Sequence, residues 1–267
     1  MFEKLAKYCA NDTKNRREYI LDTLRSLKID PVVQKFTHNN IEMTNIFATI
    51  GKKDVPISAF SAHYDKTIEG DGALDNGAAV IELLTTLETM LKKNYNKPFG
   101  FMFFDGEEQG SAGSKRYIED QILHASKIYN IDVVGRGDAI LVGDESFGNI
   151  WYKYEPNSKL LNDIVTQTCN QLSIPVFHAK TGPSDNFILN RAEIDPLTQT
   201  KIQSTIIMAV KYKLGEYWAE RVDITPGIYK CLHINGEADK IDKVQPETLQ
   251  MMTNLLLQIA ENTTYTK

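Results

Sequence analysis

The chain has 267 residues, of which 42% are hydrophobic and 24% are charged, so it can bury one sizeable core. Thirty lysines and arginines against thirty-five acidic residues give a formal charge of −5, which argues against nucleic acid as a partner. The ordinary glycine and proline counts exclude collagen and low-complexity disorder, and they favour a folded enzyme or binding domain.

The hydropathy of the chain predicts neither a secretion signal nor a membrane span. Residues 1–12 hold no apolar stretch long enough for a signal peptide, and no later stretch approaches the length of a membrane span. We therefore expect a cytoplasmic protein with no membrane contact. Three widely spaced cysteines match neither a disulfide framework nor a metal knuckle, so we expect reduced thiols at Cys9, Cys169 and Cys231.

The first predicted elements are a helix and two strands. Apolar residues at helical spacing predict an amphipathic helix over Asn15–Leu27, which ends before Pro31. β-Branched and aromatic residues predict strands over Val32–Phe36 and Thr44–Ile50. We expect these two strands to pair across the turn region His38–Asn40.

From residue 55 onward, predicted strands alternate with predicted helices. Strands are expected at Val55–Ala62, Phe99–Phe104, Ile128–Val134, Ala139–Val142 and Thr205–Val210. Helices are expected at Gly77–Leu91, Ser114–Ile122, Lys159–Leu172 and Glu247–Glu261. This alternation predicts a single α/β domain over residues 1–267, with a mixed, mostly parallel sheet sandwiched between helices. Two polar stretches are interpreted as insertions that border a site, Asn190–Lys201 and Lys211–Thr225.

Acidic and histidine residues gather where the predicted strands end. Five segments carry them: Ser61–Asp65, Gly72–Gly77, Phe103–Gly110, Asn130–Gly135 and Leu232–Gly236. Each segment alone is typical of a turn, a hydrogen-bonded structural histidine or a solvated acidic pair. Loops beyond strand carboxyl ends meet at one edge of such a sheet, however, and carboxylates crowded there repel one another and lose hydration. A divalent cation removes both penalties, and histidine with carboxylates favours zinc, with manganese or cobalt as substitutes.

Taken in order, the short motifs of these segments resemble those of a known family. The motifs are His63-x-Asp65, Gly72-Ala-x-Asp75-Asn-Gly-Ala, Gly106-Glu-Glu-x-Gly110 with a following Gly113-Ser114, and Asn130-x-Asp132-x-x-Gly135. They are similar to the motifs of co-catalytic, two-zinc aminopeptidases of the leucyl aminopeptidase and aminopeptidase S or Y type. That family is related in fold to glutamate carboxypeptidase and glutaminyl cyclase. The resemblance covers residues 44–244 and implies metal-dependent removal of the N-terminal residue from a peptide substrate.

The resemblance also implies a set of zinc ligands. The five residues that match the family's ligands are His63, Asp75, Glu108, Asp132 and His233. In the family arrangement Asp75 bridges two zinc ions. His63 and Asp132 would complete one of these ions, and Glu108 and His233 the other.

Two further residues would have catalytic roles by the same resemblance. Asp65 would accept the second ring N–H of His63 and so orient it. Glu107 would be the general base, taking a proton from the attacking water and passing it to the leaving amine. The resemblance also implies a cis peptide bond between Asp75 and Asn76.

The chain departs from the family pattern at two positions. Asn186 stands where family members commonly carry the histidine of a Ser-Asp-His motif. The final family motif, His-Thr-x-x-Asp, is altered so that Glu237 occupies the place of its acid. Glu237, or alternatively Asp239, is therefore the candidate for orienting His233.

Two other functions remain compatible with these motifs. A glutaminyl cyclase shares the fold and a segment like Phe103–Glu108, but it uses one zinc and hydrolyses no peptide. A non-catalytic interaction module of the same fold would need none of the ligands. The segments Asp75–Gly77 and Asn130–Asp132 favour the two-zinc aminopeptidase over the cyclase.

Overall fold

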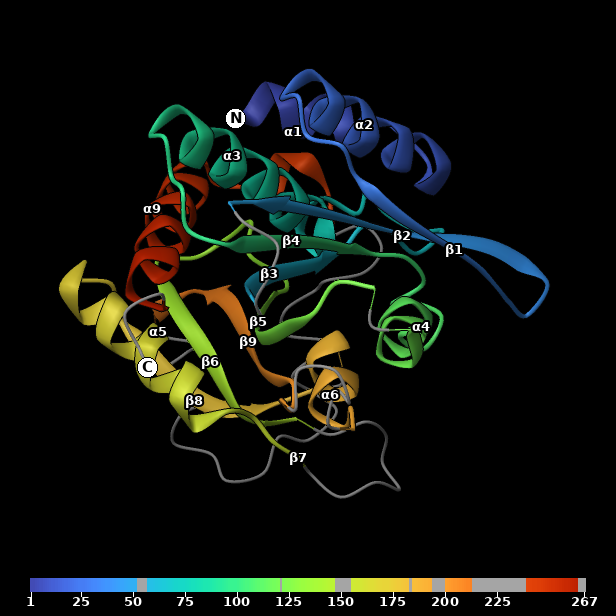
Figure 1. Ribbon diagram of the computed structural model, residues 1–267. Coiled ribbons are helices and arrows are strands. Elements are labelled where there is room, and N and C mark those ends of the chain that lie inside the picture. The colour runs from blue at the N-terminus through green and yellow to red at the C-terminus, as the bar shows by residue number, and fades with distance from the viewer. Residues whose placement is uncertain are drawn as a thin grey trace.

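A mixed sheet of nine strands runs through the part of the chain that the computed structural model describes (Figure 1). The described residues are 1–51, 57–120, 122–146, 155–182, 184–193, 200–212 and 239–263. The strands are β1 (Val32–His38), β2 (Ile41–Ile50), β3 (Ile57–His63), β4 (Phe99–Phe104), β5 (Ala125–Ile131), β6 (Ala139–Ser146), β7 (Glu155–Pro156), β8 (Val176–Thr181) and β9 (Gln203–Val210). Their order across the sheet is β1-β2-β4-β3-β5-β9-β6-β7, and β8 pairs with β6.

The centre of this sheet is parallel. Strand β3 pairs in parallel with both β4 and β5, and β5 pairs in parallel with β9. Antiparallel pairs lie on both flanks, β1 with β2 and β2 with β4 on one side, and β9 with β6 on the other. The carboxyl ends of β4, β3, β5 and β9 therefore open at one edge of the sheet, where ligands bind in folds of this class.

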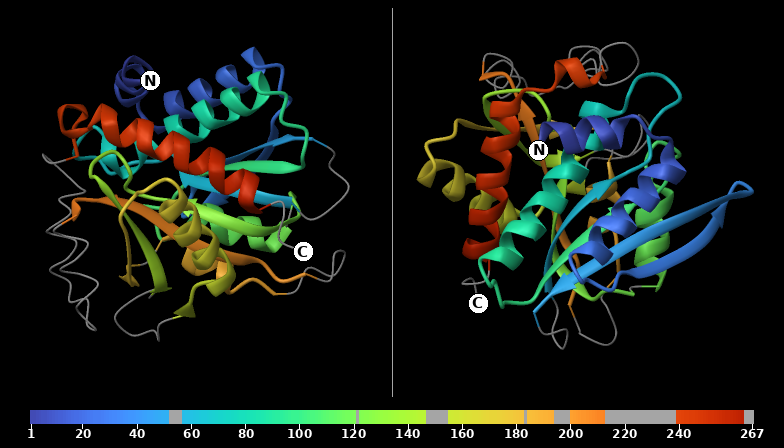
Figure 2. Two further views of the ribbon diagram at one scale, coloured as in Figure 1. Left: turned by 90° about the vertical axis from the view of Figure 1, so that its left-hand side faces the viewer. Right: turned by 90° about the horizontal axis from the view of Figure 1, so that it is seen from above.

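Helices cover both faces of the sheet (Figure 2). They are α1 (Phe2–Cys9), α2 (Thr13–Ser26), α3 (Ala78–Lys92), α4 (Ala112–Asp120), α5 (Lys159–Gln171), α6 (Asp185–Asn190) and α9 (Pro246–Thr263). Buried side chains of α1, α2, α3, α5 and α9 form one core with one face of the sheet, and α4 packs against the opposite face. The predicted α/β sandwich is confirmed.

The turn between β1 and β2 explains why these strands pair as predicted. Asn39 and Asn40 both have positive φ, at 48° and 63°. Positive φ at two central residues is the geometry of the primed turns whose twist matches a hairpin, and asparagine tolerates it better than most residues. The two strands pair in register from Val32 opposite Phe47 to His38 opposite Ile41.

Several predicted boundaries differ from those of the structure. Strand β5 ends three residues before the predicted end at Val134, because Val133 has a φ of 53° that no strand accommodates. The sequence patterns also missed α1, β8 and α6, because elements of six to eight residues are shorter than the window over which a periodic pattern is read. Most of the predicted insertion Lys211–Thr225, and the middle of Asn190–Lys201, lie outside the described residues. None of the helices described is both long and apolar enough to cross a bilayer.

Gly113 allows α4 to pack against the turn that follows β4. A Cβ atom at this position would overlap the Asn45 side-chain oxygen and the backbone of Asp105. We expect Gly113→Ala to lower the free energy of unfolding by about 1–3 kcal/mol, the usual cost of overpacking, in urea denaturation. The matched control is Lys115→Ala, an exposed position on the same helix that should stay near the parent. Equal stability of Gly113→Ala and the parent would contradict this packing.

Candidate metal centre

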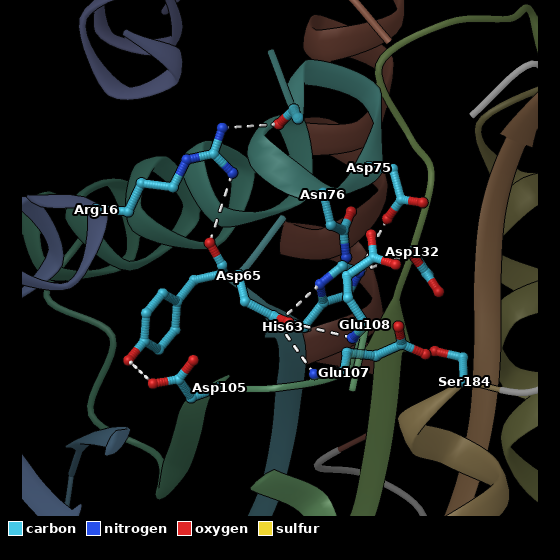
Figure 3. Close-up of polar contacts among 12 residues, drawn as sticks. Arg16, His63, Asp65, Asp75, Asn76, Asp105, Glu107, Glu108, Asp132 and Ser184 are labelled. Carbon is cyan, nitrogen blue, oxygen red and sulfur yellow. Dashed lines mark hydrogen bonds and ion pairs between the residues drawn. The ribbon is translucent and has the colours of Figure 1, made fainter. Parts of the chain in front are cut away.

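His63 lies at the carboxyl end of β3, and three carboxylates surround its ring (Figure 3). The Nε2 atom lies 3.0 Å from Asp75 Oδ1 and 3.5 Å from Asp132 Oδ1. The Nδ1 atom lies 3.3 Å from Asp65 Oδ1. Donor atoms of His63, Asp75 and Asp132 all lie within 4.8 Å of one another, and all three residues are buried. Three of the five predicted ligands thus converge on one point.

Asp75 reaches this point from the turn Ala73–Gly77, which joins the loop after β3 to α3. The peptide bond between Asp75 and Asn76 is cis, as predicted. The Asn76 side chain fastens the turn to the end of β5, because its Nδ2 donates to the Ile131 carbonyl at 2.8 Å and its Oδ1 accepts from the Val133 N–H at 3.2 Å. Asp75 and Asp132 are therefore held by one hydrogen-bonded framework.

Asp65 connects His63 to the two glutamates that follow β4. Its Oδ1 accepts the backbone N–H of Glu107 at 3.0 Å, and its Oδ2 accepts that of Glu108 at 3.1 Å. The Oδ1 atom is also the one beside the His63 ring. Figure 3 shows the side chains of both glutamates beside His63 and the two aspartates of the proposed metal site. One carboxylate thus sets the position of the imidazole and of the glutamate pair.

Burial and crowding shift the pKa values of these groups. Burial alone would lower the pKa of His63, but the surrounding aspartates raise it well above its usual value. Burial, together with repulsion from neighbouring carboxylates, raises the pKa of Glu107 well above its usual range and that of Glu108 to about 8. His63 counteracts both of these shifts. Among the described residues, the cluster therefore contains more acidic groups than its one imidazole can balance.

The donor atoms fit a divalent metal ion. Both ring nitrogens of His63, together with Glu108 Oε1 and Asp132 Oδ1, are buried with no hydrogen-bond partner among the described residues. The contacts of His63 with the aspartates are short, but they are poorly aligned for hydrogen bonds. A cation between these atoms would give each of them a partner, and histidine with carboxylate oxygens is a donor set that zinc accepts.

Residues 45–260 match Peptidase family M28. The chain belongs to this family. Among curated relatives, the M28 chain is 29% identical over 111 residues to a vacuolar membrane protease of Saccharomyces cerevisiae, covering 40% of the chain and 11% of that protein. It is 29% identical over 126 residues to leucine aminopeptidase 2 of Arthroderma otae, covering 45% of the chain and 25% of that protein. The aligned stretches thus cover at most a quarter of these relatives.

Three solved structures share the fold of the M28 chain at low sequence identity. The LapA aminopeptidase of Legionella pneumophila aligns with a TM-score of 0.71 and 14% identity, over 98% of this chain and 70% of that one. A zinc aminopeptidase of Bacillus subtilis aligns with a TM-score of 0.63 and 18% identity, over 86% of this chain and 53% of that one. The glutaminyl cyclase of Porphyromonas gingivalis aligns with a TM-score of 0.72 and 16% identity, over 98% of this chain and 96% of that one. These similarities establish the fold.

Asp185 belongs to the acidic cluster of the M28 chain, although the motifs did not assign it a role. It begins α6, is fully buried, and neither of its carboxylate oxygens has a hydrogen-bond partner among the described residues. The Ser114 hydroxyl lies nearby but donates to the Ser111 carbonyl. Burial raises the pKa of Asp185 to about 7, and this carboxyl in turn raises the pKa of Glu107. The only sequence signal was its place in the Ser-Asp-x motif.

The departure at Asn186 is accommodated by hydrogen bonds to two polar side chains. Its Nδ2 donates to Ser146 Oγ at 2.8 Å and to Asn157 Oδ1 at 2.9 Å. Two residues of the final motif, His233 and Glu237, lie outside the described residues.

Asp239 is the part of the final motif that the structure describes. It is buried, and its Oδ1 accepts the backbone N–H groups of Leu74 at 2.6 Å and Asp75 at 3.2 Å. Burial raises the pKa of this carboxyl to about 6. Asp239 therefore supports the turn that carries Asp75, whereas its suggested contact with His233 involves a residue outside the described part.

In the metal-free protein, Glu108 should make stability fall as the pH rises. Its pKa is 4.5 when unperturbed and about 8 in the folded protein, chiefly because it is buried. As the pH rises, the unfolded state releases this proton at a lower pH than the folded state does. The contribution of Glu108 to the free energy of unfolding is therefore full below the unfolded pKa and is lost as the pH rises towards the folded value. We expect Tm in EDTA to fall more steeply from about pH 5 to about pH 8 in the parent than in Glu108→Gln.

The matched control for this titration is Glu88→Gln. Lys4 and Lys92 lower the pKa of Glu88 to about 2, so its carboxylate is ionised across the range in both states. Its variant should keep the parental dependence of Tm on pH. A Glu108→Gln protein with the parental slope would show that this carboxyl does not titrate abnormally.

Proposed function

We propose that the chain is a zinc-dependent aminopeptidase, which hydrolyses the N-terminal residue from peptides at a two-zinc site. The observation that carries the proposal is the convergence of His63, Asp75 and Asp132 at the carboxyl ends of β3 and β5 in a member of Peptidase family M28. The fold shared with aminopeptidases, one of them described as a zinc aminopeptidase, supports it.

The proposed zinc ligands are those expected from the motifs: His63, Asp75, Glu108, Asp132 and His233. When bound, the metal would polarise the scissile carbonyl and lower the pKa of water to be used in hydrolysis. Asp65 would keep the His63 ring in place through the contact at Nδ1, which leaves Nε2 to face Asp75 and Asp132. The same carboxylate would hold the backbone from which Glu107 and Glu108 project.

Glu107 is the proposed general base. It would take a proton from the attacking water and donate it to the leaving amine as the peptide bond breaks. In the metal-free protein, burial and repulsion from neighbouring carboxylates such as Asp185 raise the pKa of Glu107 well above its usual range, and a raised pKa makes a carboxylate a stronger base towards the proton of water. The two N–H contacts with Asp65 fix the Glu107 backbone, so that the side chain approaches the reacting bond from a constant direction.

A second candidate is a single-zinc acyl transfer like that of a glutaminyl cyclase. One observation favours keeping it: the alignment covers 96% of the Porphyromonas gingivalis glutaminyl cyclase but only 70% of LapA. A cyclase would act on peptides with an N-terminal glutamine and would release ammonia in place of an amino acid. The non-catalytic alternative predicts neither product.

The products of the zinc-reconstituted protein test these alternatives. We expect it to release free amino acids from a panel of aminoacyl anilides and from a peptide with N-terminal glutamine. It should bind about two equivalents of zinc by elemental analysis, as a bridged pair requires. Pyroglutamate as the sole product with one equivalent of zinc would support the cyclase, and zinc binding without turnover would support the non-catalytic module.

Glu107 and Glu108 should fail in different ways when changed. Glu107→Gln keeps the shape of the side chain and the proposed ligand set, so zinc content should stay parental while kcat falls by about 10²–10⁴, the usual worth of general acid–base catalysis. Glu108→Gln removes an anionic ligand, so zinc content and activity should fall together. Full peptidase activity in zinc-loaded Glu107→Gln would exclude Glu107 as the base.

A further inference from the structure

Arg16 of helix α2 is fully buried and contacts two of the chain segments that carry proposed zinc ligands, those of His63 and Asp75 (Figure 3). Its Nη1 donates to the Tyr64 carbonyl at 3.5 Å. Tyr64 lies between His63 and Asp65 in the chain. Its Nη2 donates to the carbonyls of Asp71 at 2.5 Å and Gly72 at 3.2 Å, directly before the turn that carries Asp75.

The partners of this guanidinium are unusual for a buried charge. No carboxylate of the described residues forms an ion pair with Arg16, and its Nε has no hydrogen-bond partner there. The charge is compensated by three carbonyl dipoles and by the ring of Tyr8, whose centroid lies 4.8 Å from Cζ. A buried cation is costly without such partners, so the backbone carbonyls and the guanidinium hold one another in place.

The loop is shaped to receive this side chain. Gly72 has a φ of 58°, and a Cβ there would lie 2.8 Å from Nη2 of Arg16. Any other residue at this position would both strain the backbone and displace the guanidinium. The close approach therefore depends on glycine at the start of the turn.

A second residue, of opposite charge to Arg16, also binds the backbone of this turn. Asp239 accepts the N–H groups of Leu74 and Asp75. Arg16 instead donates to the carbonyls of Asp71 and Gly72, which precede them in the chain. The Asp71 N–H also donates to the Asp239 carbonyl at 2.8 Å. The turn is thus fixed by a cation on its carbonyls and by an anion on its amides.

We propose that Arg16 is a positioning residue that preorganises His63 and Asp75 to share a metal ion. It lies before residues 45–260, so this support comes from outside the part of the chain that matches the M28 family. The planar fork of a guanidinium can bind carbonyls in two directions at once, which a lysine ammonium on a flexible stem does less well. The inference rests on the proposed zinc site, since it assigns Arg16 a role in assembling that site.

Zinc affinity of the metal-free protein tests the proposal without any measurement of activity. The dissociation constant is obtained by competition with a chromophoric chelator for the parent, Arg16→Met and Arg16→Lys. We expect Arg16→Met to bind zinc about 10–100-fold more weakly, as loss of a residue that orients ligands usually does, with Arg16→Lys between it and the parent. The matched control is Arg25→Met, an exposed arginine of the same helix that pairs with Asp22.

A role in folding alone would lower the Tm of the metal-free variants and leave the zinc affinity of the folded molecules unchanged. Parental zinc affinity in folded Arg16→Met or Arg16→Lys would therefore overturn the proposal. Absence of zinc binding by the parent would instead overturn the proposed function, so the two failures are distinguishable.

Hydrogen exchange in the metal-free parent provides a test that needs no variant. The Gly77 N–H donates at 3.0 Å to the Gly72 carbonyl, which also accepts a hydrogen bond from Arg16. If the turn is preorganised, this amide should exchange slowly before metal is added, and zinc should slow it little further. Exchange at the rate of an exposed amide in the metal-free parent would overturn the proposal even if both Arg16 variants fail to fold.

Discussion

The concentration of buried carboxylates around one imidazole is the constraint on which the rest of this structure depends. Several acids share a small volume with His63, and burial and repulsion raise the pKa of three of them, Asp75, Glu107 and Glu108. Such a cluster would separate if its carriers were free to move, because like charges repel strongly where water is scarce. The fold opposes this separation with hydrogen bonds to the backbone of Asp75, Glu107 and Glu108.

The parallel strands and these hydrogen bonds together place the acidic residues of the site. The ends of β3, β4 and β5 are adjacent in the sheet, so residues that follow them are close before any side-chain interaction forms. Hydrogen bonds from Asn76 to the end of β5, and from the glutamate backbone to Asp65, then fix the loops against one another. The sheet brings the acids near one another, and the polar side chains set their final spacing.

The sequence predicted the parts of this arrangement that local patterns encode. Strand ends followed by acids and histidine predicted the meeting of His63 and Asp132, and the core strands were recognised by their apolar runs. The roles of Arg16 and Asp239 could not be predicted, because each binds the backbone of a distant segment and such contacts leave no periodic trace. Asp185 was missed for a related reason, since only its burial beside Glu107 distinguishes it from an ordinary residue at the start of a helix.

The contacts around the turn before α3 also have a consequence for the order of events during synthesis. The amides of Leu74 and Asp75 bind a carboxylate that lies 165 and 164 residues further along the chain. Domains fold as units while the ribosome extends them from the amino terminus, and contacts between distant residues form late. A nascent chain that has not yet reached residue 239 lacks the anion that holds this turn. The proposed metal centre is therefore complete only after most of the polypeptide has been made, and the surrounding scaffold is in place before it forms.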